Sequence, residues 1–526
     1  MIKNFLVILE SKRQSELVGN SLAKSGRFSH SRFATASTNG RLFDIDPDYI
    51  PNIDELDVLP NETPVSEDTL EFIRQEIEKY DTIVIASDND VEGDKIAFDI
   101  SRLASEKHLL RTHYSSLNTE SVLQSTLDAK PYTPNLPKSY FARRIFDKAL
   151  SCRSDLSRVS APVLRGVAEG DLTTGYITIK TKTRTAIIEC KGLTQLEVCE
   201  LSHLANAHSE MINAQPLQLQ SLTPISAQTG SEQLTAISQQ LNIPPKETFN
   251  HLQSLYEKGK ISYFRTDTKV LTPLEEKMLQ RELRKLGLTP KPLSESHKTE
   301  KPAHNCLLAQ DYSTLSKNIN MLSLEEKVLN IVAVNSLKLT LRQNINNFET
   351  TTKPVASVFT NHQLKSLHDK TDVTIIRNGK RPNSLESIED FTSRMTKSTR
   401  EIHTDVSPST RYFPLTPEQS IAKYLTDNNL ARPSTLASHA TKIANSYLTE
   451  EHKLNAQGKV LLRGLEKSIP DITEVSVCTS ILETLQSNDL SLHESLEQAL
   501  SIAGITKSKH QSKGSKDHQN TQGIDF

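Results

Sequence analysis

The chain has 526 residues, of which 36% are hydrophobic and 24% are charged, and its formal net charge is −2. This length exceeds one ordinary hydrophobic core, so we expect several domains. The near-neutral charge argues against a uniformly basic nucleic-acid-binding protein, although it allows a basic channel balanced by acids elsewhere. No apolar stretch approaches the roughly 18 residues of a membrane span, and the N-terminal residues lack the cleavage region of a signal peptide. We therefore expect a cytoplasmic protein.

The cysteines are few and widely spaced, and no C-x-x-C pair occurs. Paired cysteines at short spacing are typical of structural zinc sites, and an even set in a short secreted chain is typical of disulfide frameworks. The sequence therefore predicts neither feature. The five cysteines are Cys152, Cys190, Cys199, Cys306 and Cys478.

Two β-prone runs near the N-terminus each end in acidic residues. The run NFLVIL at residues 4–9 is followed by Glu10, and the run TIVIA at residues 82–86 leads into Asp88, Asp90, Glu92 and Asp94. Because the carboxyl ends of parallel strands meet at one edge of a sheet, we expect these acids to lie close together. Crowded carboxylates raise one another's pKa unless a cation lies among them, and oxygen ligands favour Mg²⁺. The alternative is an ordinary acidic turn before a helix that begins near residue 95.

The rest of the chain alternates helical and strand-like segments. Residues 70–80 place three apolar side chains on one helical face, and residues 131–137 are typical of a linker. We expect further helices at residues 139–150, 231–241, 244–259, 322–342 and 416–448, and a strand at residues 355–378. The β-branched alternation at residues 176–196 favours strand, with a helix as the alternative.

Tyr263 and Arg265 lie just after the helix predicted at residues 244–259, in a segment for which we expect an exposed turn or a short strand. Since a single residue separates the two, an extended backbone directs both side chains to the same side. A tyrosine hydroxyl titrates near ~10 and needs cationic help to act as a nucleophile. An arginine supplies such help and also binds phosphate. The alternative is a tyrosine that only packs its ring beside an unrelated arginine.

Taken together, these motifs resemble the type IA DNA topoisomerases, in family order from about residue 4 to about residue 465. The specific signals are the Toprim pattern of Glu10 and residues 88–94, and the segment at residues 255–268. Weaker matches complete the series: Ala142-Arg143 with Asp147, residues 173–178, Ala303-His304-Asn305-Cys306-Leu307 and Ala431-Arg432-Pro433-Ser434-Thr435.

The resemblance implies a multidomain fold of α/β and α parts, in which a Toprim domain, helical domains and a β-rich arch form a toroidal architecture. The Toprim domain would span residues 1–135, and the tyrosine-bearing catalytic domain residues 223–344. Helical DNA-binding segments would span residues 139–186 and 413–503, the β-rich arch residues 187–222 and 345–412, and a disordered tail residues 504–526.

The resemblance also implies an activity that needs no ATP. Tyr263 would attack a phosphodiester of single-stranded DNA and stay joined to the 5′ phosphate until the 3′ hydroxyl reverses the reaction. Arg265 would grip the scissile phosphate and Glu10 would shuttle a proton to the 3′ oxygen. The supporting catalytic candidates are His304, Asp267 and Lys12, although neither Lys12 nor Arg13 matches a common placement of the family's lysine.

The same resemblance implies the ligands. Mg²⁺ would be held by Asp88, Asp90 and Glu92, together with Glu10. DNA contacts are expected from Arg143, Tyr176, Thr178, Arg432 and Thr435. The partner would be single-stranded or underwound DNA, acted on in relaxation or decatenation by a monomer that works with a helicase or a single-strand-binding protein.

Three departures from the family pattern keep alternatives open. Tyr176 and Thr178 stand where the family usually has Arg and Gln, and Asp94 replaces a Glu. The lack of zinc-ribbon cysteines favours a topoisomerase III-like member over the zinc-bearing topoisomerase I subgroup. The alternatives are another Toprim enzyme, such as a primase or nuclease, and a catalytically impaired relative that binds single-stranded DNA.

Overall fold

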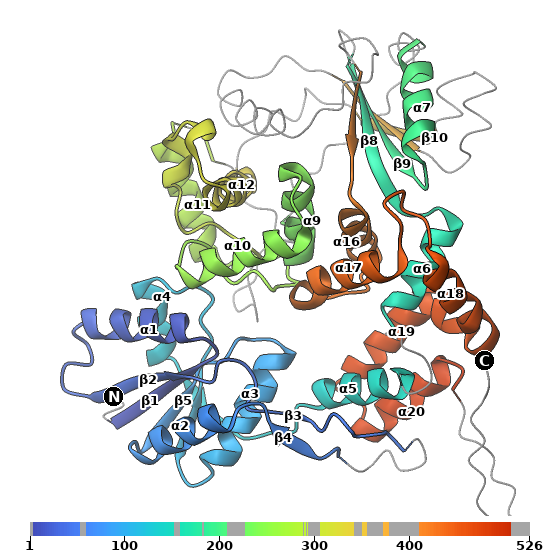
Figure 1. Ribbon diagram of the computed structural model, residues 1–526. Coiled ribbons are helices and arrows are strands. Elements are labelled where there is room, and N and C mark those ends of the chain that lie inside the picture. Colours follow the sequence, from blue (N-terminus) through green and yellow to red (C-terminus); the bar gives the residue numbers. More distant parts are fainter. Residues whose placement is uncertain are drawn as a thin grey trace, which may run out of the picture.

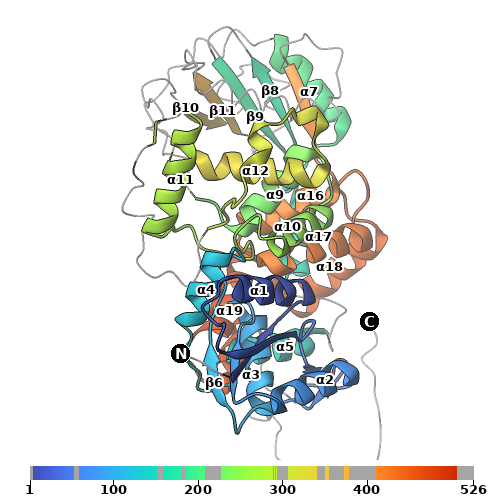
Figure 2. The ribbon, with the colours of Figure 1, turned by 90° about the vertical axis from the view of Figure 1, so that its left-hand side faces the viewer.

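The computed structural model describes residues 4–52, 59–151, 158–180, 184–207, 227–287, 289–290, 292, 306–340, 350–354, 372–377 and 410–505. Figure 1 shows an N-terminal α/β domain at one end of the molecule and a second sheet at the other, with helices between them and further helices beside the N-terminal domain. The view from the side shows the same order along the long axis (Figure 2).

The N-terminal domain is built on a sheet with strand order β2-β1-β5-β6-β7. The first four strands run parallel, and β7 joins antiparallel to β6 at the edge. Its elements are β1 (Asn4–Leu9), α1 (Lys12–Lys24), β2 (Arg32–Ser37), β3 (Phe43–Ile45), β4 (Glu62–Pro64), α2 (Glu67–Glu78), β5 (Thr82–Ile85), α3 (Val91–Leu103), β6 (His108–Arg111), α4 (Thr119–Leu127) and β7 (Lys130–Pro131).

Both faces of this sheet are buried, which explains why β1 is a continuous apolar run. Phe5 and Val7 pack in the same cluster as Val18 of α1, whereas Leu6 packs in the cluster that contains Ile73 of α2. The helix expected at residues 70–80 is confirmed as α2, and its predicted apolar face is the buried one. The acids that follow β1 and β5 therefore come together at the same sheet edge.

Helix α3 begins earlier than expected. We predicted a start near residue 95, but the first helical residue is Val91, because the Asp90 carboxylate caps the helix by accepting from the backbone N–H groups of Glu92 and Gly93. Aspartate is a favoured N-cap residue, since it satisfies amides that have no partner within the helix. The second half of the acidic run is therefore the first turn of a helix.

The second sheet has strand order β10-β11-β9-β8-β12, and its described strands are antiparallel. The strands expected within residues 176–196 are confirmed as β8 and β9, and the described part of the segment 355–378 is β11. A domain boundary at residue 187 would cut β9, so we propose that this arch begins with β8. The elements are β8 (Thr173–Lys180), β9 (Arg184–Lys191), α7 (Gln195–Ala207), β10 (Thr350–Pro354), β11 (Asp372–Arg377) and β12 (Thr410–Pro414).

The helices form two groups. In one group α5 packs against α19 and α20 from the far end of the chain, as Figure 1 shows. This group comprises α5 (Lys138–Ser151), α6 (Ser160–Glu169), α16 (Pro417–Asp427), α17 (Pro433–Tyr447), α18 (Ala456–Ser468), η5 (Pro470–Thr473), α19 (Val475–Gln486) and α20 (Leu492–Ile502). The other comprises α9 (Gly230–Leu241), α10 (Pro245–Glu257), α11 (Pro273–Lys285), η2 (Ser313–Ser316), η3 (Ile319–Met321) and α12 (Leu324–Lys338).

None of the helices in the described ranges is both long enough and apolar enough to cross a membrane.

Candidate functional site

The segment that carries Tyr263 is buried rather than exposed. Tyr263 is 5% exposed, and its neighbour Phe264 is fully buried. The expectation of an exposed turn is therefore wrong, because distant parts of the chain cover the segment. The Ser262 amide donates to the Leu308 carbonyl, and the Tyr263 amide donates to the carbonyl of Ser115 in the N-terminal domain.

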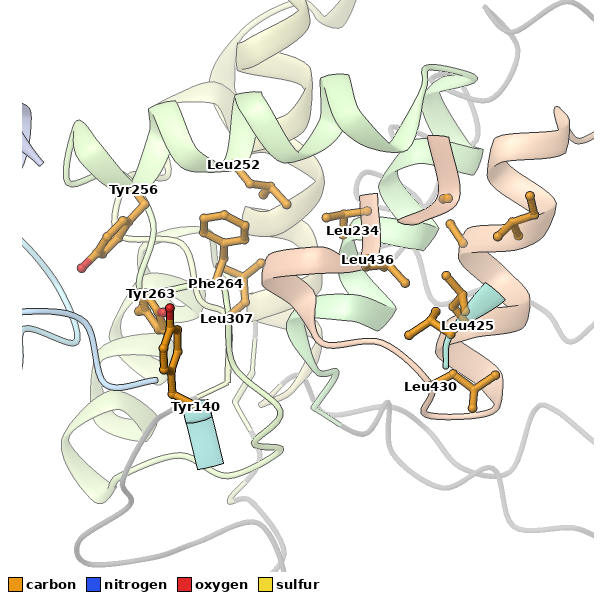
Figure 3. Packing of buried hydrophobic residues seen from close by; sticks show 14 of the residues in the cluster. Tyr140, Leu234, Leu252, Tyr256, Tyr263, Phe264, Leu307, Leu425, Leu430 and Leu436 are labelled. Carbon is orange, nitrogen blue, oxygen red and sulfur yellow. The ribbon is translucent and has the colours of Figure 1, made fainter. Parts of the chain in front are cut away.

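Close backbone contact and ring packing fix the course of this segment. The Gly230 amide donates to the Thr266 carbonyl at 2.7 Å, and a Cβ on Gly230 would lie 1.8 Å from the Phe264 carbonyl oxygen. Figure 3 shows Tyr256, Tyr263 and Phe264 close together in the packed interior. The rings of Tyr256 and Tyr263 meet edge to face, with centroids 5.5 Å apart. These contacts leave the Tyr263 side chain little freedom.

The hydroxyl of Tyr263 reaches the acidic loop. Tyr263 Oη donates to Asp90 Oδ2 at 2.8 Å. Burial raises the pKa of Tyr263 well above its usual value, the charges of Asp88 and Asp90 raise it further, and Arg265 opposes them. In this arrangement Tyr263 is a protonated, neutral phenol that faces carboxylates.

Arg265 lies between the tyrosine segment and the acids, on the side to which Tyr263 also points. Its Nη2 donates to Gln253 Oε1 at 2.8 Å, while its Nη1 is 3.7 Å from Glu10 Oε1 and 3.9 Å from Asp88 Oδ2. Burial alone would lower the pKa of Arg265, but the negative charges of Asp88 and Glu10 raise it above the ordinary value. The guanidinium is therefore the permanent cation of this cluster, as the spacing of Tyr263 and Arg265 predicts.

Glu10 and Asp88 are the buried acids of the site. Burial raises the pKa of Glu10 well above its usual range, and the charge of Asp88 adds to this. Burial likewise raises the pKa of Asp88 to about 6, against the lowering effect of Arg265. We expected neighbouring acids to be the main cause for Glu10, but desolvation is the larger one.

Gln14, which the sequence did not single out, joins this cluster. It is 2% exposed, and its Nε2 donates to Asp88 Oδ1 at 3.2 Å. Its Oε1 accepts from the Ser11 amide in a capping box at the start of α1. The capping pattern was visible in the sequence, but the contact with Asp88 was not.

Arg111 and Gly93 shape the acidic loop. The Arg111 guanidinium donates to Ser87 Oγ and to the carbonyl of Asp88. A Cβ on Gly93 would lie 1.8 Å from the Asp88 carbonyl oxygen, so only glycine fits beneath the loop. Asp94, which departs from the family pattern, lies on the exposed side with its carboxylate 3.6 Å from Arg111.

The oxygen donors at this edge are of the kind that divalent cations take. Glu10 Oε2 is buried and accepts no hydrogen bond from the described residues, and the charges of Asp88 and Asp90 both act on Glu10. Glu92 instead pairs with Arg41 at 2.9 Å. Within the described ranges, no three His, Cys, Asp or Glu side chains already surround one metal position. The donor chemistry of Glu10, Asp88 and Asp90 therefore suits a divalent cation, but in this arrangement these side chains do not surround one metal position.

A basic cavity of about 380 Å³ adjoins the acids. Arg143 lines it, and its buried Nε and Nη2 make no hydrogen bond to the described residues. Burial and the nearby charges of Arg432 and Arg158 lower the pKa of Arg143 to about 9. Because a buried cation without partners is costly, an anion in this cavity would stabilise it. The predicted DNA contacts Arg432 and Thr435 line the same cavity, which we name the arginine cavity.

Asp147, one helical turn from Arg143, pairs with a different arginine. Asp147 lies 3.2 Å from Arg158 Nε, which leaves Arg143 directed at the arginine cavity.

Of the other predicted catalytic residues, two are exposed and one lies outside the described residues. Lys12 is exposed in the first turn of α1. Asp267 is exposed, and its charge acts on Arg143. His304 lies outside the described residues.

Tyr176 and Thr178 stand on β8 of the second sheet. Tyr176 is half-buried beside Lys423, and burial raises its pKa to about 12. The role of both residues as DNA contacts stays a prediction.

Comparison with known proteins gives a consistent family. The family described as DNA topoisomerase matches residues 223–487, just over half of the chain, and the Toprim domain matches residues 5–117. The chain is similar to reverse gyrase 2 of Sulfurisphaera tokodaii, with 27% identity over 234 residues that cover 38% of the chain and 19% of that relative. It is also similar to reverse gyrase 2 of Sulfolobus acidocaldarius, with 27% identity over 241 residues that cover 42% of the chain and 21% of that relative. The matched part is about a fifth of the length of these relatives.

Among solved structures, the full-length topoisomerase I of Thermotoga maritima is similar, with a TM-score of 0.63, 17% identity, and coverage of 95% of this chain and 89% of that one. This likeness confirms the expected toroidal architecture, with its α/β domain, helical domains and β-rich arch. At this identity the likeness concerns the fold alone.

Proposed function

The chain belongs to the DNA topoisomerase family, and on this premise we propose that it is an active, Mg²⁺-dependent type IA enzyme that opens one DNA strand through Tyr263, lets another strand pass and rejoins the first. The single observation that carries the proposal is the meeting of two separate domains at the site: Tyr263 and Arg265 of one point at Glu10, Asp88 and Asp90 of the other.

In the cleavage step, Tyr263 Oη attacks the phosphorus and the bond from phosphorus to the 3′ oxygen breaks. The phenol proton must leave, and Asp90 Oδ2 lies within hydrogen-bond distance to accept it. Negative charge builds on the phosphate oxygens, and Arg265 is the buried cation that offsets it. The phosphate stays on Tyr263 as a 5′ phosphotyrosyl ester, so the bond energy is retained without ATP.

The leaving 3′ oxygen needs a proton, and Glu10 is the proposed donor. Burial holds the pKa of Glu10 well above its usual range, which keeps a proton on the carboxyl at higher pH. In rejoining, the 3′ hydroxyl returns this proton to Glu10 and attacks the phosphotyrosyl ester, the bond between phosphorus and Tyr263 Oη breaks, and Asp90 gives the phenol proton back to Tyr263. Glu10, Asp88 and Asp90 would hold Mg²⁺, which when bound supplies positive charge to orient the phosphate; Glu92 would join after it releases Arg41.

DNA binding would use the arginine cavity, where Arg143, Arg432 and Thr435 face a space next to the acids. Lys12, His304, Asp267, Tyr176 and Thr178 remain proposed contributors to catalysis or strand contact. We further propose a cytoplasmic monomer that acts on single-stranded or underwound DNA, in relaxation or decatenation, beside a helicase or single-strand-binding protein.

The test compares the parent protein with Tyr263→Phe in relaxation of negatively supercoiled plasmid and in detergent-trapped protein–DNA adducts. We expect the parent to relax plasmid and form an adduct, and Tyr263→Phe to do neither. Tyr312→Phe, in the same domain, is the matched control and should behave as the parent. Equal relaxation by Tyr263→Phe would refute the proposal, primer synthesis or cutting without an adduct would favour another Toprim enzyme, and binding without cleavage would favour an impaired relative.

A further inference from the structure

A second cavity, of about 450 Å³, also meets the acidic loop. Asp88 and Asn89 line this cavity, whereas Asp90, Val91 and Glu92 line the arginine cavity. The loop therefore separates the two spaces. Tyr263 lines the second cavity and is not among the described residues that line the arginine cavity.

The lining of the second cavity suits a polar strand. Arg111, His113 and Lys130 bring basic groups from the end of β6 and from β7, and Thr272 adds a hydroxyl from the N-terminus of α11. Lys130 is exposed, so its ammonium is available to a ligand at the surface. Asp128 also lines the cavity, where its carboxylate accepts from Gln124.

We propose that this second cavity, which we name the lysine cavity, holds the DNA segment on the 3′ side of the cleaved bond, and that Lys130 contacts its backbone. The inference rests on the proposed function. If Tyr263 keeps the 5′ phosphate, every nucleotide on the 3′ side of the break stays attached to Tyr263 and must leave through the space that Tyr263 lines. The segment with the free 3′ hydroxyl then lies on the other side of the acidic loop, in the arginine cavity.

The binding test uses single-stranded oligonucleotides that share the 5′ segment and either end at the mapped cleavage position or continue by several nucleotides. Lys130→Ala should weaken binding of the longer oligonucleotide by roughly two- to fivefold, as for one exposed ion pair, and leave the shorter one unchanged. Lys130→Glu should weaken binding of the longer oligonucleotide more. The slope of log affinity against log salt concentration should become shallower by the equivalent of about one phosphate contact. Lys24→Ala, an exposed lysine that lines neither cavity, is the matched control.

A second test locates the strand directly. Photocrosslinking bases are placed one or two nucleotides to either side of the cleaved bond, and the crosslinked peptides are identified by mass spectrometry after the Tyr263 adduct forms. We expect the 3′-side probe to label the peptide that contains His113 or Lys130, and the 5′-side probe to label those with Arg143 or Arg432.

The two tests separate the inference from the proposed function. An adduct on Tyr263 whose 3′-side probe labels the arginine cavity, with Lys130→Ala binding as the parent does, would overturn the inference alone. Absence of any Tyr263 adduct would overturn both.

Discussion

Tyr263 Oη donates a hydrogen bond to Asp90 Oδ2 at 2.8 Å, and the other oxygen of the same carboxylate caps helix α3. One side chain thus holds the nucleophile and begins the helix that follows the acidic loop. Since the cap uses Oδ1 alone, the proposed Mg²⁺ would bind Oδ2 in place of the tyrosine and leave the cap intact. The hydrogen bond from Tyr263 to Asp90 therefore joins the tyrosine-bearing domain to the N-terminal domain.

Substitutions at Asp90 should separate these two roles. Asn retains the capping oxygen and should leave the free energy of unfolding nearly unchanged, whereas Ala removes the cap and should cost about 1 kcal/mol. Both substitutions should reduce the rise in melting temperature that Mg²⁺ causes, because each removes a charged carboxylate that would bind the ion. Thermal melts with Mg²⁺ and with chelator measure both effects. An undiminished Mg²⁺ shift in Asp90→Asn would exclude Asp90 as a ligand.

Removal of Arg265 should slow cleavage far more than it weakens DNA binding. The guanidinium is the buried cation beside Glu10 and Asp88, and loss of one such group typically costs about 10²–10³ in rate. We expect Arg265→Ala to lower the rate of adduct formation by about this factor, and Arg265→Lys to retain part of the activity because it keeps the charge without the fork. Single-turnover adduct formation and oligonucleotide affinity are the measurements. A Lys variant as slow as the Ala variant would show that the fork geometry, rather than the charge, is what matters.

The sequence predicts the chemical groups of this site better than their surroundings. Glu10, Asp88 and Asp90 were predictable because two apolar runs each end in carboxylates, and neighbouring parallel strands of one sheet bring such ends together. The spacing of Tyr263 and Arg265 predicted that both side chains point to the same side, and only the family resemblance gave the pair a role in the site. The burial of Tyr263 was not, because the covering groups, such as the Ser115 carbonyl, come from a different domain.

Residues that act through one distant contact were invisible in the sequence. Gln14 reaches Asp88 across 74 positions, and nothing local distinguishes it from any glutamine in a first helical turn. Arg111 is an ordinary basic residue at a strand end until the loop at residues 87–93 folds over it. The pairing of Glu92 with Arg41 is likewise a tertiary event, so the sequence placed Glu92 with the metal ligands while the fold gives it another partner.

Gly93 gives a test of the loop geometry. An alanine Cβ there would lie 1.8 Å from the Asp88 carbonyl oxygen, whereas one on Gly464 in α18 would meet no atom within 4 Å. We expect Gly93→Ala to cost about 1–3 kcal/mol, as overpacked sites do, and to abolish relaxation because the loop must move. Gly464→Ala should be neutral or stabilise the helix by up to about 1 kcal/mol. Chemical denaturation and plasmid relaxation check both variants, and a fully active Gly93→Ala would show that the loop position is not needed.

The raised pKa of Asp88 predicts how stability depends on pH in the absence of metal. Burial raises this pKa from 3.8 to about 6, so the folded state keeps the proton to higher pH than the unfolded chain does. The stabilising contribution is fully present below the ordinary pKa and is lost as the pH rises through about 6. In chelator, Asp88→Asn should therefore gain stability over the parent between about pH 4 and about pH 8, by about 1–3 kcal/mol. Mg²⁺ should restore the parent at the higher pH and leave Asp88→Asn unaffected.

Asp311 provides a control of opposite sign. Burial raises the pKa of Asp311, but hydrogen bonds from Ser313 and the charge of Lys260 outweigh it and lower the pKa below the ordinary value. The stabilising contribution of Asp311 is then present above its ordinary pKa and is lost as the pH falls. Asp311→Asn should therefore lose stability relative to the parent at about pH 8 and less so in acid. If the stability of both variants relative to the parent changed in the same direction with pH, the cause would be net charge. The destabilisation that we assign to ionised Asp88 in the metal-free site would then be refuted.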